Sequence, residues 1–499
     1  MKNNKHTHLA MTMPLILAVA VWTACNTNTA TTAAASSDGK IPITTKSDEA
    51  KNEFVQGRDL TERLQGQESL QHFDKAIALD PDFASAELAR ANNSPTTKEF
   101  FEHLNKAVSL ADKVSEGEKL TILANQAGVN GDVVKQKEYW EKLVAAYPND
   151  ERAQVNLANY YFGQQEVGPA IEHYKKTVEV APNFSPTYNS LGYAYRQQGD
   201  YANAELAFKK YVELIPGDPN PYDSYAELLL KMGRFDESIA QYRKALAINS
   251  HFPSSHFGIA ADLLYTGKAA EAEAEMQKIA AESRNDGELR TALFGLSVVA
   301  ADSGNLEKSA QEMDKEFAVA EKNNDVVSMA ADLQAKGNIL SQVPKYELAK
   351  QQFDRSFEMI QSSSQSQEIK DNSKLLHEYN LAAIAIGMSN YAEAKAHAEE
   401  FRKGAEASNN ALQIQQAHQL AGRIALAQKD YPTAIAELEQ ANQQNPQDLY
   451  RLYQAYQGKG DKAKAQEYCA KAAGFNSLPQ LPYAFIRVKA QKATAGKKA

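Results

Sequence analysis

The chain has 499 residues and a formal net charge of −9, is rich in Ala, Leu, Glu, Gln and Lys, and contains only two cysteines. Unbranched side chains of this kind favour helix, and an acidic chain is poorly matched to the phosphate backbone of nucleic acid. Two cysteines exclude a disulfide framework. We therefore expect an all-α protein that does not bind nucleic acid.

Residues 1–24 have the pattern of an export signal. Lys2 and Lys5 precede an apolar stretch, residues 9–21, that is too short to span a bilayer. Cys25 follows the small pair Thr23-Ala24. We predict a signal peptide over 1–24 and a lipidated cysteine with a flexible tether over 25–48, because residues 26–47 are small, polar and aperiodic.

This ending of the signal resembles the bacterial lipobox, in which a cysteine is acylated before the signal is cut. Trp22 departs from the family pattern, which usually has Leu three residues before the cysteine. Asn26, rather than Asp, then implies an outer-membrane lipoprotein that faces the periplasm. The alternative is ordinary cleavage further on, within residues 33–35, which would leave a soluble secreted or periplasmic protein.

The body of the chain repeats at a constant interval, which the equally spaced Pro148, Pro182 and Pro216 mark. The repeat 185–218 has large residues at Leu191, Tyr195 and Phe208, small ones at Gly192 and Ala204, and a turn at Gly199-Asp200. The large residues would fill the space between two antiparallel helices, which the small residues allow to cross closely. A unit of this kind cannot bury its apolar face alone, so the units must stack.

These positions resemble the tetratricopeptide repeat family in register. The resemblance implies a right-handed superhelical solenoid of helix-turn-helix repeats, with about eleven or twelve repeats in all. The regular array covers 49–286 and includes a degenerate stretch, 84–116. A looser array with longer repeats covers 287–479, where the recurring tyrosines Tyr346, Tyr391 and Tyr431 are more widely spaced than the prolines of the regular array. Residues 361–367 are expected to form a loop, and 480–499 a capping helix with a basic tail.

No catalytic or metal motif is present: the sequence contains no GxxxxGK[ST], GxSxG, HExxH or GxGxxG pattern. The histidines are scattered, and His251 and His256 are more plausible as cap or surface residues than as ligands. Cys469 stands where other repeats have core residues. We therefore expect no catalytic residues, no metal, no cofactor and no enzyme activity.

By the same resemblance, the first helix of each repeat lines a concave surface. Carried onto the regular repeats, its positions are Asn159, Phe162, Asn189, Tyr193, Arg196, Asp223, Glu227 and Lys231. A row of polar and aromatic side chains of this kind is expected to bind an extended peptide or a partner helix. The family's carboxylate clamp is not expected, because Val155 replaces its first basic residue, and Asp223 and Glu227 oppose an anionic ligand.

The leading hypothesis is a protein-binding scaffold of the bacterial envelope whose protein partner is not identified. An alternative is a SusD-like glycan- or solute-binding lipoprotein. Such proteins rely on aromatic platforms in long insertions, whereas this chain has two tryptophans, one of them in the signal, and no such insertion. A lytic transglycosylase would require a catalytic module after the solenoid, for which too few residues remain.

Overall fold

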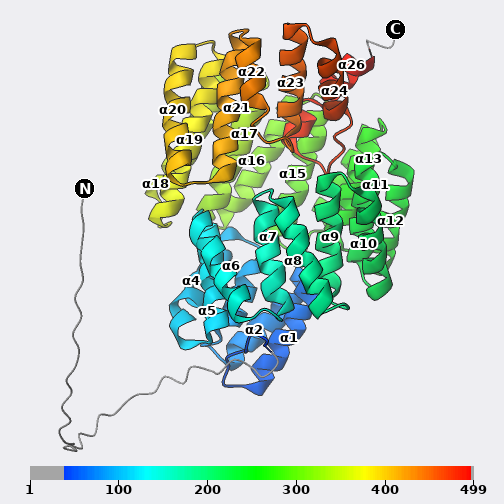
Figure 1. Cartoon of the computed structure of the whole chain (residues 1–499), viewed down its shortest axis with the longest axis vertical. Helices are drawn as coiled ribbons and strands as arrows, with labels where there is room; N and C mark the ends of the chain where they lie inside the picture. Colours follow the sequence, from blue (N-terminus) through cyan, green and yellow to red (C-terminus); the bar gives the residue numbers. More distant parts are fainter. Residues whose placement is uncertain (1–38, 496–499) are drawn as a thin grey trace, which may run out of the picture.

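The computed structural model describes residues 39–495, so the predicted signal peptide and Cys25 lie outside the described residues. Within this range the chain forms helices α1 to α26 and no β-strand. The fold is the predicted all-α solenoid. Figure 1 shows the first helices at the bottom and the helices of the second half, yellow to orange, at the top.

The helices of the first half are α1 (Asp48–Glu62), α2 (Gly66–Leu79), α3 (Ala84–Asn92), α4 (Thr97–Leu110), α5 (Glu116–Val129), α6 (Val133–Ala146), α7 (Glu151–Gly163), α8 (Val167–Val180), α9 (Ser185–Gln198), α10 (Tyr201–Leu214), α11 (Pro219–Lys231), α12 (Phe235–Ile248), α13 (Pro253–Tyr265) and α14 (Ala269–Glu282). Those of the second half are α15 (Asp286–Asp302), α16 (Leu306–Lys322), α17 (Val326–Leu340), α18 (Tyr346–Ser362), α19 (Gln367–Gly387), α20 (Tyr391–Ala407), α21 (Ala411–Ala427), α22 (Tyr431–Leu438), α23 (Pro446–Lys459), α24 (Lys462–Ala473), α25 (Leu481–Ala484) and α26 (Arg487–Ala495). Among the described residues, consecutive helices pack as twelve pairs, α1–α2 to α23–α24, in agreement with the expected number of repeats.

In several pairs a small residue of one helix faces a large side chain of the other. A Cβ atom added to Gly192 of α9 would lie 2.5 Å from the ring of Phe208 on α10. Gly57 faces Phe73, and Gly337 faces Phe353, in the same way. Since these rings are buried, the glycines allow the two helices of a repeat to approach closely.

The turn inside a repeat also follows from local chemistry. Gly199 ends α9 with a φ of +83°, a left-handed conformation that glycine adopts without strain. Asp200 then accepts a hydrogen bond from the backbone N–H of Asn203 and caps α10. Gly460 and Asp461 repeat the same arrangement between α23 and α24.

The longer period of the second half comes from longer helices. Helices α15, α16, α18, α20 and α21 each have 17 residues, and α19 has 21. The loop predicted at 361–367 was placed too broadly, because α18 continues to Ser362 and α19 begins at Gln367, where Ser366 caps it. The run of polar residues resembled a loop, but a serine at the N-cap needs only a short one.

Neither of the two irregularities expected from the sequence interrupts the solenoid. Residues 84–116 contain an ordinary pair, α3–α4, although α3 has only 9 residues. At the boundary 286/287, one apolar cluster includes Ala260, Met276 and Leu296 and so joins α13, α14 and α15. The two arrays are therefore parts of one continuous stack.

Part of the predicted tether is bound to the repeats. Backbone N–H groups of residues 41, 44 and 46 donate hydrogen bonds to carboxylates that are largely buried, those of Asp150, Glu118 and Asp80, over 2.9–3.0 Å. This differs from the expected free tether over the whole of 25–48. The composition of 40–46 gave no sign of it, because the carboxylates that hold the segment belong to different repeats.

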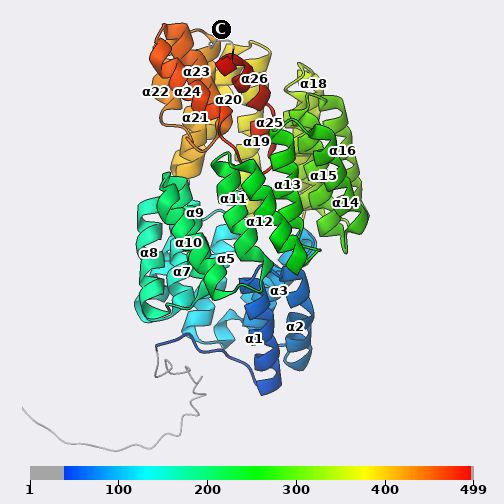
Figure 2. The same cartoon turned by 90° about the vertical axis from the view of Figure 1, so that its right-hand side faces the viewer.

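The superhelix closes on itself. Loops and helix ends that are far apart in sequence meet directly, through Arg284–Glu68 (2.8 Å), Thr97–Asp325 (3.0 Å) and Asn372–Asn130 (2.9 Å). Figure 2 shows α14 on the same side of the molecule as α2 and α3. These contacts limit how far the coil can open.

The chain ends by crossing back over the solenoid. Helix α26 packs along α24, where the sequence predicts a capping helix, and α25 contacts both α23 and α15. In Figure 1 this red segment reaches the side of α15. The C-terminal residues therefore bridge parts of the coil that are far apart in sequence.

Most of the histidines that the structure describes join the two helices of one repeat. In His72–Glu53, His173–Gln154, His256–Glu275, His397–Glu378 and His418–Glu437, the Nδ1 atom bonds a side chain 19 positions away, and His103 bonds Glu87 in the same manner. The expectation that His256 is a cap or surface residue was therefore wrong, because its side chain is buried between the helices. The common spacing of these histidine contacts is visible only once the helices are paired.

We expect Gly192→Ala to lower the free energy of unfolding by about 1–3 kcal/mol, because the new methyl group would force the Phe208 ring to move. Urea unfolding followed by circular dichroism measures the change. The matched control is Gly163→Ala at the end of α7, where a Cβ atom meets nothing within 4 Å. It should leave stability unchanged or raise it slightly. Equal losses in both variants would contradict the packing explanation.

Candidate functional site

The predicted groove residues lie on three first helices that follow one another in the stack. Asn159 and Phe162 are on α7; Asn189, Tyr193 and Arg196 on α9; and Asp223, Glu227 and Lys231 on α11. Five of the eight, Phe162, Tyr193, Arg196, Glu227 and Lys231, line one cavity of about 500 Å³. Asn159, Asn189 and Asp223 do not line it.

An ion pair organises one wall of this cavity. Arg196 Nη1 donates to Glu227 Oε1 over 2.6 Å, and the Tyr193 hydroxyl donates to Glu227 Oε2 over 2.7 Å. The Arg196 guanidinium also lies 4.6 Å from the centroid of the Tyr193 ring. Burial raises the pKa of Tyr193 well above its ordinary value, so its hydroxyl keeps its proton and remains a donor. These contacts hold the three side chains of the wall in place, and the opposite charges of Arg196 and Glu227 largely cancel.

The three remaining predicted residues behave differently from one another. Asn159 accepts a hydrogen bond from the Tyr174 hydroxyl over 2.6 Å, and the buried Asp223 accepts one from Ser255 over 2.7 Å. Asn189 has a buried side-chain oxygen with no hydrogen-bond partner. Asp223 therefore belongs to the packing between helices, and the Asn189 oxygen is buried away from the cavity.

The opposite wall of the cavity comes from the end of the chain. Residues 475–480, in the connection between α24 and α25, line it together with Gln444. Lys231 donates a hydrogen bond to the carbonyl oxygen of Phe475, and its Nζ lies 3.9 Å from the centroid of the Phe475 ring. Burial lowers the pKa of Lys231 to about 8, with a further contribution from the nearby Arg196.

Sequence reasoning did not identify this second wall. Lys231 and Phe475 are 244 positions apart, and the segment 474–480 has neither the repeat pattern nor a motif. The one available signal was its composition, because "GFNSLPQ" interrupts the helical pattern with Gly, Asn, Ser and Pro. That signal predicts a break in the helix but not what the break contacts.

A second polar strip lies in the looser half of the solenoid. Gln419 of α21 accepts a hydrogen bond from the Tyr379 hydroxyl and donates one to Asp448 of α23 over 2.6 Å. Arg451 pairs with the other oxygen of Asp448 over 2.6 Å. The irregular repeat length there prevented the register from being assigned, so these residues were not proposed from the sequence.

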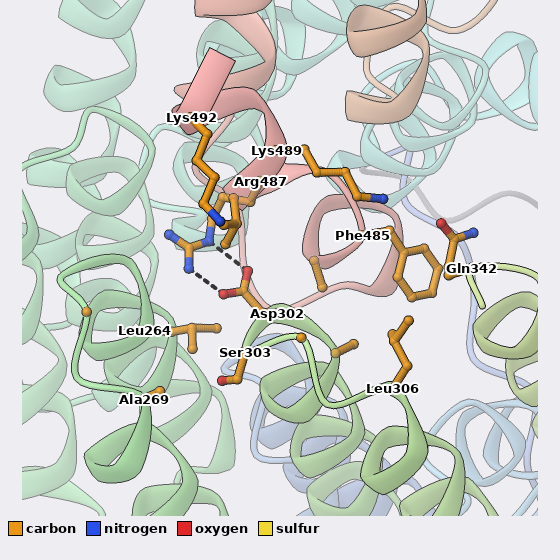
Figure 3. A pocket seen from close by; sticks show the side chains of 15 residues that line it. Leu264, Ala269, Asp302, Ser303, Leu306, Gln342, Phe485, Arg487, Lys489 and Lys492 are labelled. Carbon is orange, nitrogen blue, oxygen red and sulfur yellow. Dashed lines mark hydrogen bonds and ion pairs between the residues drawn. The ribbon is translucent and has the colours of Figure 1, made fainter. Parts of the chain in front are cut away.

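Beside the end of the chain lies a further cavity of about 520 Å³. Arg487 of α26 donates to both carboxylate oxygens of Asp302, at the end of α15, with a distance of 2.7 Å from Nε to Oδ2. Figure 3 shows this pair at the edge of the cavity, with Phe485 and Leu306 opposite. Both side chains of the pair are almost fully buried, and the pair therefore anchors the returning segment.

The cysteine of the last repeat lies in the core. Cys469 is buried and contacts the Thr494 hydroxyl and the Ala490 carbonyl, while Cys25 lies outside the described residues. Between residues 39 and 495 no group of three or more His, Cys, Asp or Glu side chains is placed to hold a metal ion. None of the helices in that range combines the length and apolar character needed to cross a bilayer.

The sequence profile of the tetratricopeptide repeat family matches residues 185–218 and 220–252. These are the two repeats, α9–α10 and α11–α12, that supply most of the predicted residues at the cavity. These two helix pairs are tetratricopeptide repeats.

Several solved structures are similar to parts of the chain, at low overall similarity. A tetratricopeptide repeat protein from Parabacteroides merdae ATCC 43184 is 16% identical over 55% of this chain and 94% of its own, with a TM-score of 0.35. MamA protein is 20% identical over 34% of this chain and 96% of its own, with a TM-score of 0.28. YrrB, described as a TPR protein with an unusual peptide-binding site, is 19% identical over 36% and 91%, with a TM-score of 0.25. No curated protein sequence matches the chain.

The buried carboxyl of Asp223 predicts a pH dependence of stability. Burial raises its pKa from 3.8 to about 7, and the nearby Glu227 carboxylate adds to the rise. Between these two pH values the folded protein holds a proton that the unfolded chain releases, so the free energy of unfolding falls as the pH rises.

We therefore expect Asp223→Asn, which removes the ionisation, to gain about 1–3 kcal/mol of stability relative to the parent chain from pH 4 to pH 7. Urea unfolding at several pH values measures the difference. Asp371→Asn, at an exposed carboxyl, should show no such trend. A difference between Asp223→Asn and the parent chain that does not change with pH would show that the carboxyl is ionised throughout.

Proposed function

We propose that this protein is a non-enzymatic scaffold that binds a protein partner, as an extended peptide or a helix, along the concave face formed by α7, α9 and α11. The observation that supports it is the cavity of about 500 Å³ on that face. Its wall presents an aromatic ring, a guanidinium and an ammonium group, those of Tyr193, Arg196 and Lys231. Groups of this kind recognise peptide carbonyls and side chains.

The glycan-binding alternative lacks support in the described residues. Recognition of sugars by aromatic platforms needs exposed rings, and the single tryptophan between residues 39 and 495, Trp140, is 5% exposed. No long insertion interrupts the helix pairs there. A glycan would therefore depend on the tyrosines, most of which pack between helices.

The location is also a proposal. Lipidation of Cys25 would hold the protein at the bacterial outer membrane, facing the periplasm, while cleavage further along the chain would release it as a soluble periplasmic or secreted protein. The described chain begins to contact the repeats at Lys40. Residues 26–39 therefore separate the proposed lipid from the folded body.

Site-specific photocrosslinking in a producing bacterium tests partner binding. A photoreactive residue in place of Gln197, which lines the cavity, should yield a discrete crosslinked adduct. The same residue in place of Glu179, exposed on the second helix α8, is the matched control and should not. Equal adducts at both positions, or none at Gln197, would reject the concave face as the binding surface.

Membrane fractionation tests the anchor. We expect Cys25→Ser to move the protein from the membrane pellet to the soluble fraction, because loss of the acylated thiol removes the buried acyl chains. Cys469→Ser changes the other cysteine and should leave the protein in the pellet. If the Cys25→Ser protein still sediments with membranes, the lipid anchor is wrong.

A further inference from the structure

The groove already contains a peptide, and it comes from the same chain. Residues 474–480, here called the C-terminal strap, form no helix and connect α24 to α25. Lys231 donates a hydrogen bond to the carbonyl of Phe475, and Tyr265 donates one to the carbonyl of Ser477. The strap is therefore held through its backbone, in the manner of a bound extended peptide.

The two donors occupy the same position of successive repeats. Lys231 is the last residue of α11, and Tyr265 is the last residue of α13, the first helix of the next repeat. They reach carbonyls two residues apart in the strap, on either side of Asn476. Two successive repeats thus each bind one carbonyl of the strap, with the last side chain of their first helix.

Two side chains of the strap add contacts that, unlike the backbone hydrogen bonds, only particular residue types can make. The Phe475 ring packs under the Lys231 ammonium, 3.9 Å from its centroid, which is a cation–π contact. Leu478 packs against the apolar cluster that contains Leu230, Tyr242 and Ile259. The spacing is an aromatic residue followed three positions later by leucine.

The strap is placed so that it can be replaced. Residues 475–480 are only half-buried, and Asn476 has a φ of +36°, in the left-handed region that costs a residue other than glycine some stability. On both sides the chain is fixed independently, by the pairing of α24 with α23 and by the buried Arg487–Asp302 ion pair. Release of the strap therefore leaves the repeats intact.

We infer that the C-terminal strap is an internal ligand of the groove, and that the partner is an extended segment with an aromatic residue followed three positions later by a leucine, which displaces the strap. The inference rests on the proposed function of the concave face. Because the strap is tethered to the groove by the chain itself, it competes with the partner for the groove at a high effective concentration, in the millimolar range. Only a partner with the same contacts and a higher affinity, or one that also fills the open part of the cavity beside α7 and α9, displaces it.

The test uses the peptide AGFNSLPQL, identical to residues 473–481, with a fluorescent label. It should bind the double variant Phe475→Ser/Leu478→Ser at least about tenfold more tightly than the parent chain, because the variant strap no longer competes. Fluorescence anisotropy measures both affinities. A control peptide with Ser in place of both Phe and Leu should not bind, and Lys231→Met in the double variant should weaken binding of the original peptide.

The double variant must keep the helical circular dichroism and the melting temperature range of the parent chain. If it does and the peptide fails to bind, or binds the parent chain equally well, the strap is not a ligand of the groove. If it does not fold, hydrogen exchange of the parent chain decides instead. An excess of peptide should then accelerate exchange within 475–480, while no acceleration would overturn the inference.

The outcomes separate this inference from the proposed function. A partner crosslinked through Gln197 together with failure of the peptide experiment would keep the scaffold and reject the internal ligand. Peptide binding without any crosslinked partner would keep the internal ligand and reject the scaffold. Concentration-dependent dimerisation of the double variant would show that the groove takes a second copy of the chain, and would reject a separate partner segment.

Discussion

The close crossing of two helices within each repeat is the constraint on which the rest of the molecule depends. Gly192 against Phe208 is the clearest case, because any side chain at the glycine would occupy the space of the ring. A pair packed in this way still leaves one apolar face open, which only the next pair can cover. Stacking therefore continues without interruption from α1 to α24, across the region where the helices become longer. The concave face, and every groove residue on it, is positioned by that repeated crossing.

Closure of the coil adds a second level of order. Arg284–Glu68 and Thr97–Asp325 link the beginning of the stack to its middle, and Arg487–Asp302 links its end to the same region. A solenoid in which each repeat touches only its neighbours is easily extended. In this chain, contacts between distant repeats restrain the curvature of the stack.

Two extended segments bind to the repeats in different ways. Residues 40–46 donate backbone N–H groups to buried carboxylates at the edge of the first repeats. The C-terminal strap instead offers carbonyls to Lys231 and Tyr265 inside the groove. Both segments are bound by the repeats through their backbone, at two different places, and the proposed scaffold function would use contacts of the same kind.

The helix pairs, their number and the placement of Tyr193, Arg196, Glu227 and Lys231 on the first helices of two successive repeats could be predicted from the sequence, because the pattern recurs within each repeat. Local spacing decides which residue faces inward in a helix. Which of those residues line a cavity could not be predicted, and neither could the strap that closes it, since the contact of Lys231 with Phe475 joins positions 244 residues apart. Such contacts are decided by the curvature of the whole stack, which sums small rotations over all repeats. By itself, therefore, the sequence determined the repeating unit, and the tertiary structure alone decided what the concave face encloses.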